Sequence, residues 1–176
     1  FVRDIELYLS CPMTDAGLTL VDTPGADSIN ARHTGVAFNY IKNADAILFV
    51  TYYNHAFSHA DSQFLDQLGR VKDQFELDKM FFIVNAADLA SDEKELQEVM
   101  EHVERNLNRH GIIAPRMFPI SSLRALEGKL ANDNAMTEAS GIKSFEAVFH
   151  SFIHDELGSL AVQSAKQELE RAANIV

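Results

Sequence analysis

Two largely apolar runs of this chain each end in a short polar loop. Residues 18–21 lead into D-T-P-G at 22–25, and residues 80–84 lead into N-A-A-D at 85–88. Continuous apolar runs of this length are typical of parallel strands that are covered on both faces. Ligands of open α/β sheets bind at the carboxyl ends of such strands. The pattern therefore predicts an α/β domain with its ligand site where these loops meet.

Strands and helices alternate along the rest of the chain, which favours a mostly parallel sheet with right-handed crossovers. Five strands are expected from the apolar patterns, and they cover residues 5–10, 18–21, 46–51, 80–84 and 117–120. Four helices are expected, and they cover 30–42, 58 or 59 to 69, 92–110 and a long final stretch from 142 past 160. The polar stretch 132–140 is expected to be a loop.

The D-T-P-G loop suits a magnesium-bound terminal phosphate, because Asp22 offers a carboxylate and Gly25 a backbone N–H. By itself the D-x-x-G pattern is weak, and it also describes an ordinary turn formed by Pro24 and Gly25. Its position after an apolar strand and before a polar segment and a helix favours the nucleotide interpretation.

The N-A-A-D loop suits the edge of guanine, through the Asn85 amide and the Asp88 carboxylate. The other interpretation is an Asx-type turn that precedes the helix at Asp92. A lysine usually follows the asparagine of such loops, and here Ala86 stands in its place. Because alanine has no stem to cover one face of a base, Ala86 predicts that the affinity for guanine is reduced or rests on other contacts.

Ser121 and Ser122 follow the last predicted strand, where a serine is also the ordinary N-cap of a helix. The order and spacing of the three motifs strengthen the interpretation that each motif supports only weakly by itself. Asp22 precedes Asn85 by 63 positions, with one strand and two helical segments between them, and Asn85 precedes Ser121 by 36, with one helix between. Three weak matches in this order, each after a strand, favour a guanine-nucleotide site.

Charge and composition narrow the classes of partner. The formal net charge of −11 opposes binding to nucleic acid and to anionic lipid surfaces. The single cysteine, Cys11, excludes an internal disulfide and favours a reducing cytoplasm. No stretch approaches the roughly 18 apolar residues of a transmembrane helix. Membrane contact is therefore expected only through parts of a longer protein that are absent from this sequence.

The chain resembles the dynamin superfamily, specifically the bacterial dynamin-like GTPases related to mitofusins. The resemblance is strongest over residues 18–90, and the segment A-D-S-I-N-A-R-H-T at 26–34 carries it more specifically than the motifs do. It implies a large GTPase that remodels or fuses membranes through nucleotide-driven dimerisation of its heads. The implied ligands are GTP or GDP with Mg²⁺, and the implied partner is a second head.

The resemblance implies a role for each residue of the first loop. Asp22 acts on Mg²⁺ through water, the Gly25 N–H senses the γ-phosphate, and Thr23 and Pro24 lie against the nucleotide. Ala26 follows D-x-x-G at the position where Ras-like enzymes orient water with glutamine. Alanine cannot do this, so catalytic help is expected from a phosphate loop, a bound cation or a partner head.

The later loops are assigned to the base by the same resemblance. Asn85 and Asp88 are expected to read guanine, and Ser121 with Ser122 to line the base pocket. The parent protein is expected in the cytoplasm, peripheral at the inner face of a membrane.

No G-x-x-x-x-G-K-[ST] phosphate loop occurs in the 176 residues. We therefore expect a P-loop GTPase-like, three-layer α/β domain that is truncated at the N-terminus, lacks its first strand and ends in a long helix. Residues 1–162 are expected to form the partial GTPase domain, and 163–176 to start a helix leading to a neck or bundle. The family topology places the lost strand between 18–21 and 46–51. The gap is expected to be closed by direct pairing of these neighbours, by self-association or by the missing segment.

Three functions compete at this level. The first is the GTP-binding and hydrolysing head of a dynamin-like protein, with the fragment itself inactive. The second is a degenerate GTPase-fold assembly or regulatory module without turnover, which Ala86 and the absent phosphate loop favour. The third is a flavodoxin-like or Rossmann-like binding module, which no G-x-G-x-x-G supports.

Overall fold

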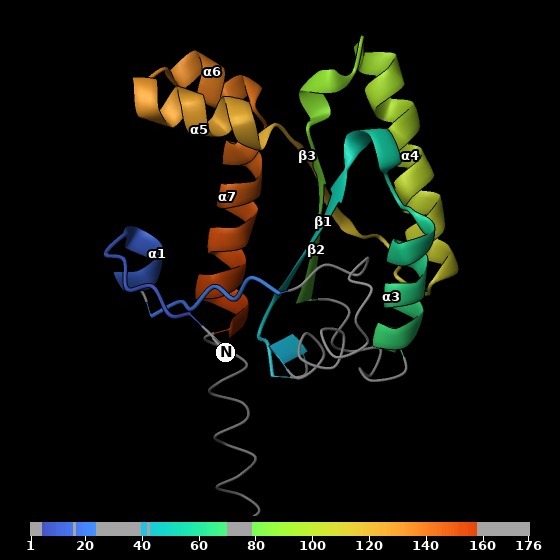
Figure 1. Cartoon of the computed structure of the whole chain (residues 1–176), viewed down its shortest axis with the longest axis horizontal. Coiled ribbons are helices and arrows are strands. Elements are labelled where there is room, and N and C mark those ends of the chain that lie inside the picture. The colour runs from blue at the N-terminus through green and yellow to red at the C-terminus, as the bar shows by residue number, and fades with distance from the viewer. Residues whose placement is uncertain (1–4, 16, 24–39, 42, 70–78, 158–176) are drawn as a thin grey trace, which may run out of the picture.

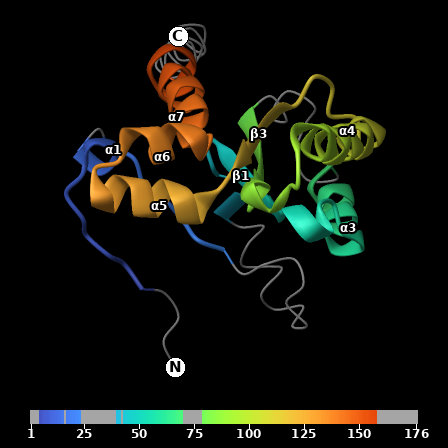
Figure 2. The ribbon, with the colours of Figure 1, turned by 90° about the horizontal axis from the view of Figure 1, so that it is seen from above.

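A three-stranded parallel sheet lies between two helical layers in the computed structural model (Figures 1 and 2). The structure describes residues 5–15, 17–23, 40–41, 43–69 and 79–157. Its strands are β1 (Ile47–Tyr52), β2 (Met80–Asn85) and β3 (Arg116–Ile120). Its α-helices are α1 (Pro12–Asp15), α3 (His59–Gly69), α4 (Glu93–Arg109), α5 (Ser122–Ala131), α6 (Asn134–Ala139) and α7 (Ile142–Ser151). The 3₁₀ turns are η1 (Tyr53–His55) and η3 (Ala87–Leu89), and the π-helical turn is η4 (Phe152–Leu157).

The sheet has the order β1-β2-β3 with both pairs parallel, as the alternation of strands and helices predicts. The three strands lie within a residue of their predicted positions. β2 is the central strand, and each of its residues except Asn85 is buried. This burial explains the uninterrupted apolar run in its sequence, because helices cover a central parallel strand on both faces.

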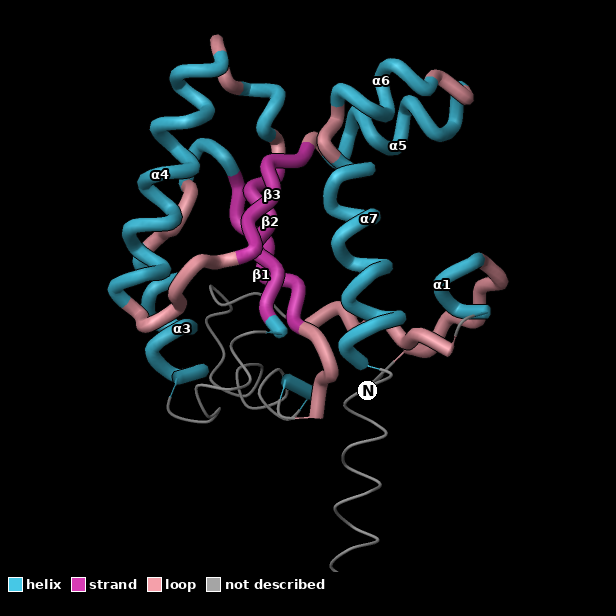
Figure 3. Tube along the Cα trace, turned by 180° about the vertical axis from the view of Figure 1, so that it is seen from behind, coloured by secondary structure: helices cyan, strands magenta, loops and turns pink. Residues whose placement is uncertain are grey.

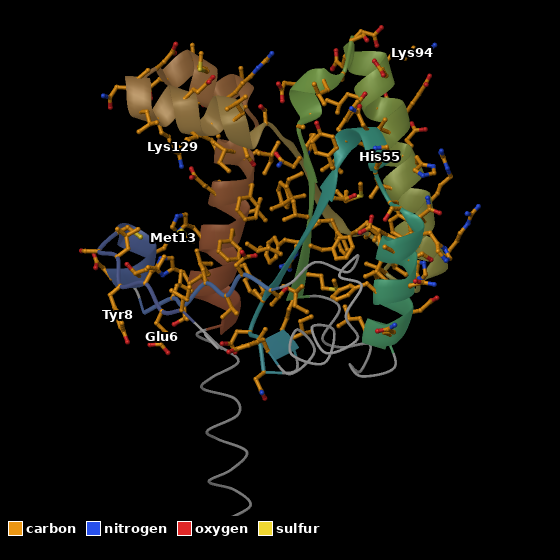
Figure 4. All side chains as sticks on the ribbon, viewed as in Figure 1. Glu6, Tyr8, Met13, His55, Lys94 and Lys129 are labelled. Atoms are coloured by element: carbon orange, nitrogen blue, oxygen red, sulfur yellow. The ribbon has the colours of Figure 1, made fainter. Side chains whose placement is uncertain are left out.

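Two apolar clusters hold the layers together. On one face, Leu68 of α3 and Leu107 of α4 pack with Phe82 and Val84 of β2. On the other face, Phe81 is surrounded by four aromatic rings at centroid distances of 5.1–6.4 Å, those of Phe118, Phe145, Phe149 and Phe152. The second cluster holds α7 and η4 against the sheet, and Met13 of α1 lies beside it (Figure 4).

The outer helices α3 and α4 are also joined by a polar contact. His110, at the C-cap of α4, has Nδ1 3.0 Å from Asp66 Oδ1 and Nε2 3.1 Å from Ser62 Oγ. Both partners lie on α3, one turn apart. The contact fixes the end of α4 against α3 on the face remote from α7 (Figure 3).

The predicted start of α4 is confirmed. Asp92 is the N-cap, and its carboxylate accepts the Glu95 N–H at 2.8 Å. The Glu95 carboxylate reaches one residue further back than the usual capping box, because it accepts the Ser91 N–H at 2.7 Å. Gly111 follows with φ +81°, which ends the helix as predicted.

Three expectations about the chain are wrong. Residues 5–10 and 18–21 form no strand, and Leu20 is 62% exposed. A strand needs a neighbour to take its backbone hydrogen bonds, and no described strand offers these segments its edge. Direct pairing of 18–21 with β1 therefore does not close the expected gap.

The predicted helix at 30–42 lies largely outside the described residues, and the tail 163–176 does so entirely.

The third error concerns the polar stretch 132–140, which contains helix α6 rather than a loop. Asp133 caps the helix by accepting the Met136 N–H at 3.0 Å. Thr137 is buried against α5 at Gly128, where an added Cβ would lie 2.6 Å from the Thr137 hydroxyl. The helix is short and polar, so its apolar periodicity is weak, and it depends on this close approach to α5.

We predict that Gly141→Ala destabilises the fold far more than Gly111→Ala. Both glycines have a φ near +80°, so alanine is strained by a similar amount at each position. A Cβ at Gly141 would lie 2.4 Å from the Pro119 carbonyl oxygen, whereas a Cβ at Gly111 meets open space. We expect an extra loss of about 2 kcal/mol or more in the free energy of unfolding, measured by urea denaturation. Equal losses would contradict the close approach of α7 to β3.

We also predict that the chain self-associates through β1. This strand is one of the two outer strands of the described sheet, and Val50 on its α7-side face is 56% exposed. Parallel strands are normally covered on both faces, so this apolar face favours association. Light scattering should give an apparent mass that rises with concentration, and Val50→Lys should lower it. Val148→Lys, on the exposed side of α7, is the control. A monomer at every concentration would contradict the prediction.

Candidate functional site

The loops that follow β2 and β3 lie side by side at the carboxyl edge of the sheet. The strand register places Asn85 opposite Ile120, so the residues after each strand are neighbours. The Asn85 side-chain oxygen accepts two backbone N–H bonds, from Ala86 at 2.8 Å and from Ser122 at 3.1 Å. One amide thus joins the N-A-A-D loop to the start of α5. We call residues 85–90 and 121–122 the base loops.

Ser121 is the N-cap of α5. Its side-chain oxygen accepts the Arg124 N–H at 3.3 Å, and its own N–H donates to the Ser140 carbonyl at 2.9 Å. The side chain is therefore committed to the helix end, as the capping interpretation predicts. Ser122 is exposed and contributes its backbone N–H to Asn85. Both serines lie at the edge of the sheet where the sequence places a base pocket.

Ala86 adopts a left-handed conformation, with φ 61° and ψ 36°. Its N–H turns back to the Asn85 side chain, and its methyl group packs against the apolar cluster under α3 and α4. The turn continues into η3, in which the Leu89 N–H donates to the Ala86 carbonyl at 3.1 Å. Ala86 is half-buried, serves the apolar cluster and the turn, and has no stem that could lie over a ligand.

Asp88 lies at the centre of the base loops and has an unexpected neighbour. Its side chain is 21% exposed, and its Oδ2 lies 3.7 Å from the Nε of Arg124. Arg124 is in the first turn of α5 and is 49% exposed. The sequence analysis did not select Arg124; the signal that identifies it is a basic residue three positions after a predicted serine N-cap.

The first loop is not brought to this edge. Asp22 is exposed and Thr23 is half-buried, while Pro24, Gly25 and Ala26 lie outside the described residues. The described segment before them passes α7 and ends beside the sheet, below the carboxyl ends of the strands (Figure 1). Within the described chain, no hydrogen bond or ion pair links Asp22 to the base loops. The structure thus assembles Asn85, Asp88, Ser121 and Ser122, and leaves Asp22 apart.

A hollow of about 310 Å³ opens near the base loops, between η1 and α4. His55 lies at this edge (Figure 4), and Tyr53 and Glu95 also line the hollow. Burial, with the nearby Glu95 carboxylate, raises the pKa of the Tyr53 hydroxyl. The bonds from Ser91 lower the pKa of Glu95, whose carboxylate fastens the end of the N-A-A-D loop to α4.

The described residues lack two kinds of feature, a cluster of metal ligands and a membrane-spanning helix. These residues contain no group of three His, Cys, Asp or Glu side chains placed to hold a metal ion. Among them there is also no helix of sufficient length and apolar character to cross a bilayer.

Comparison with known proteins identifies a protein family that this chain matches. Residues 2–88 match the Dynamin family. The chain is 51% identical to Dynamin-like protein A of Bacillus subtilis over 128 residues, which are 73% of this chain and 11% of that protein. It is 30% identical over 128 residues to the probable transmembrane GTPase FZO-like, chloroplastic, of Arabidopsis thaliana, covering 70% of this chain and 13% of that one. It is 24% identical over 175 residues to the bacterial dynamin-like protein of Nostoc punctiforme, covering 90% and 24%.

The chain spans from about a tenth to a quarter of the length of these relatives. The family match contains both D-T-P-G and N-A-A-D, the two loops that follow the apolar runs. With the parallel sheet and the loops at its carboxyl edge, these similarities show that the chain belongs to the dynamin family and corresponds to a part of the bacterial dynamin-like proteins.

Proposed function

We propose that the base loops recognise guanine in the GTPase head of a dynamin-like protein. The observation that carries the proposal is the Asn85 side chain, which joins the loop after β2, where Asp88 lies, to the start of α5 after β3. GTPases of this family bind GTP or GDP with Mg²⁺. A carboxylate at Asp88 accepts hydrogen bonds from guanine N1–H and the exocyclic amine, whereas adenine offers an acceptor and no amine there. This difference supports selectivity for guanine.

We propose a more limited part for the first loop. Asp22 acts on Mg²⁺ through water, and Gly25 meets the γ-phosphate. Magnesium commonly takes one or two carboxylates and obtains its other ligands from phosphates and water. A single exposed carboxylate is compatible with that pattern but is not a metal site by itself. The proposal for Asp22, Thr23, Pro24 and Gly25 therefore rests on the family resemblance and on the motif.

Self-association of heads is the proposed mode of assembly, in a protein that remodels or fuses membranes from the cytoplasmic side. The outer face of α5 supports it, because Leu123, Leu126 and Leu130 recur at helical spacing and are all exposed. Helix α5 begins at Ser122, so this apolar stripe continues from the base loops. The high negative charge opposes direct binding to lipid or nucleic acid by these residues.

A second function is an assembly or regulatory module that does not turn over nucleotide. The observation in its favour is Ala86, which is packed into the core and leaves the base site without the usual lysine stem. Nucleotide binding and turnover, measured separately in the intact protein, distinguish the two functions.

We predict that Asp88→Asn in the intact protein weakens GTP binding by about tenfold or more, because the amide keeps one acceptor and turns its NH2 donor towards the second guanine donor. The same change should improve binding of xanthosine nucleotides, since xanthine presents an oxygen where guanine has its amine. Calorimetric titration with both nucleotides measures the shift. Asp92→Asn is the matched control, because asparagine also caps a helix. Unchanged GTP affinity in Asp88→Asn would remove this residue from the site.

We predict negligible GTP hydrolysis by the 176 residues alone. A phosphate loop supplies the N–H groups and the lysine that hold the β- and γ-phosphates, and this sequence contains none. Phosphate release should therefore stay at the uncatalysed rate with and without Mg²⁺. Magnesium-dependent turnover that Asp22→Ala abolishes would contradict this prediction.

A further inference from the structure

We propose that Arg124 is the base-stacking residue of this site, with its guanidinium plane against one face of the purine while Asp88 reads the edge. This inference rests on the proposed recognition of guanine. It is carried by two contacts, the packing of the partly buried Ala86 against the apolar cluster and the approach of Arg124 to Asp88.

Ala86 creates the need for such a residue. A nucleotide base is held by contacts to its edge and by cover over its faces, and stacking contributes substantially to base binding. The residue after Asn85 is an alanine whose side chain packs under the loop, so it covers neither face. Cover from the protein must then come from another residue beside Asp88.

Arg124 is placed to supply that cover. Its backbone is fixed by the N–H bond to Ser121, in the first turn of α5. Its Nε lies 3.7 Å from Asp88 Oδ2, which is beyond hydrogen-bond length, so the carboxylate keeps its capacity to accept bonds from a base. Half of the side chain is exposed, whereas Asp88 is mostly enclosed. The guanidinium thus lies beside the carboxylate and is itself partly open to solvent.

The contact with Asp88 does not account for Arg124 as a stabilising residue. A half-exposed ion pair at this distance adds little to stability. A cation in the first turn of a helix also lies near the positive end of the helix dipole, and α5 has no acidic residue there to offset it. A ligand above the base loops is a better explanation of an arginine at this position.

The chemistry of arginine suits this role. The guanidinium group is planar and more weakly hydrated than an ammonium, and it stacks on aromatic faces. Stacking does not depend on which groups a purine carries at its edge. Arg124 should therefore contribute affinity for guanine and xanthine alike, whereas Asp88 should decide between them.

The test measures dissociation constants of GDP and XDP for the intact protein and for five variants, which are Arg124→Ala, Asp88→Asn, the double variant of these two, Arg124→Lys and Arg105→Ala. Arg124→Ala should weaken GDP binding about tenfold. In the Asp88→Asn background, Arg124→Ala should weaken XDP binding by a similar factor. Arg124→Lys, which keeps the charge and loses the plane, should recover only a small part of the loss. Arg105→Ala is the matched control, because it removes an exposed arginine that pairs with a carboxylate on α4. Inorganic triphosphate, which has no base, should bind Arg124→Ala and the unchanged protein equally.

The outcomes separate this inference from the proposed function. If Asp88→Asn does not exchange GDP for XDP, the guanine site itself is wrong. If the exchange occurs and Arg124→Ala binds both nucleotides normally, the stacking role alone is overturned. Full recovery by Arg124→Lys, or a loss confined to GDP, would overturn it as well, because Arg124 would then act only by holding the Asp88 charge. A loss of triphosphate binding would also count against it.

Discussion

The fold depends on the burial of β2 on both of its faces. Phe82 and Val84 point towards α3 and α4, and Phe81 points into the aromatic cluster under α7. Because a parallel strand cannot turn back directly to its neighbour, helices must cross over the sheet and cover it. The same strand ends at Asn85, so the most buried element of the domain also carries the first residue of the candidate site. The first of the base loops therefore starts directly from a buried strand.

Asn85 links the two loops at this edge of the sheet. Its side-chain oxygen accepts N–H groups from two loops that are 36 residues apart in sequence, and so satisfies backbone donors that the loops leave unpaired. Ser121 ties the same edge to the residues before α7 through the Ser140 carbonyl. The candidate site is consequently held from both helical layers. The first loop has no such ties among the described residues, which is why Asp22 stands apart from the edge.

Periodicity succeeded where a segment packs against the sheet and failed where it does not. The strands at β1, β2 and β3 and the helices α3, α4 and α7 were predictable, because each has one continuous apolar face or run. The segments 5–10 and 18–21 have strand-like patterns but no described partner strand, and their side chains are mostly exposed. The opposite error occurred at α6, whose polar sequence hides a helix that depends on Asp133 and on contact with Gly128.

The sequence by itself determined the class of fold and the order of the motif residues, since these follow from local patterns and their spacing, and its resemblance to dynamin-like proteins indicated the family. It also identified Asn85, Asp88, Ser121 and Ser122 as candidates. Only the tertiary structure decided how they are used: Ser121 caps a helix, Ala86 faces the core, and Arg124 lies beside Asp88. The reason is physical. Pairing of β2 with β3 brings distant loops together, and the contacts at that edge depend on strand register and backbone angles that no local pattern encodes.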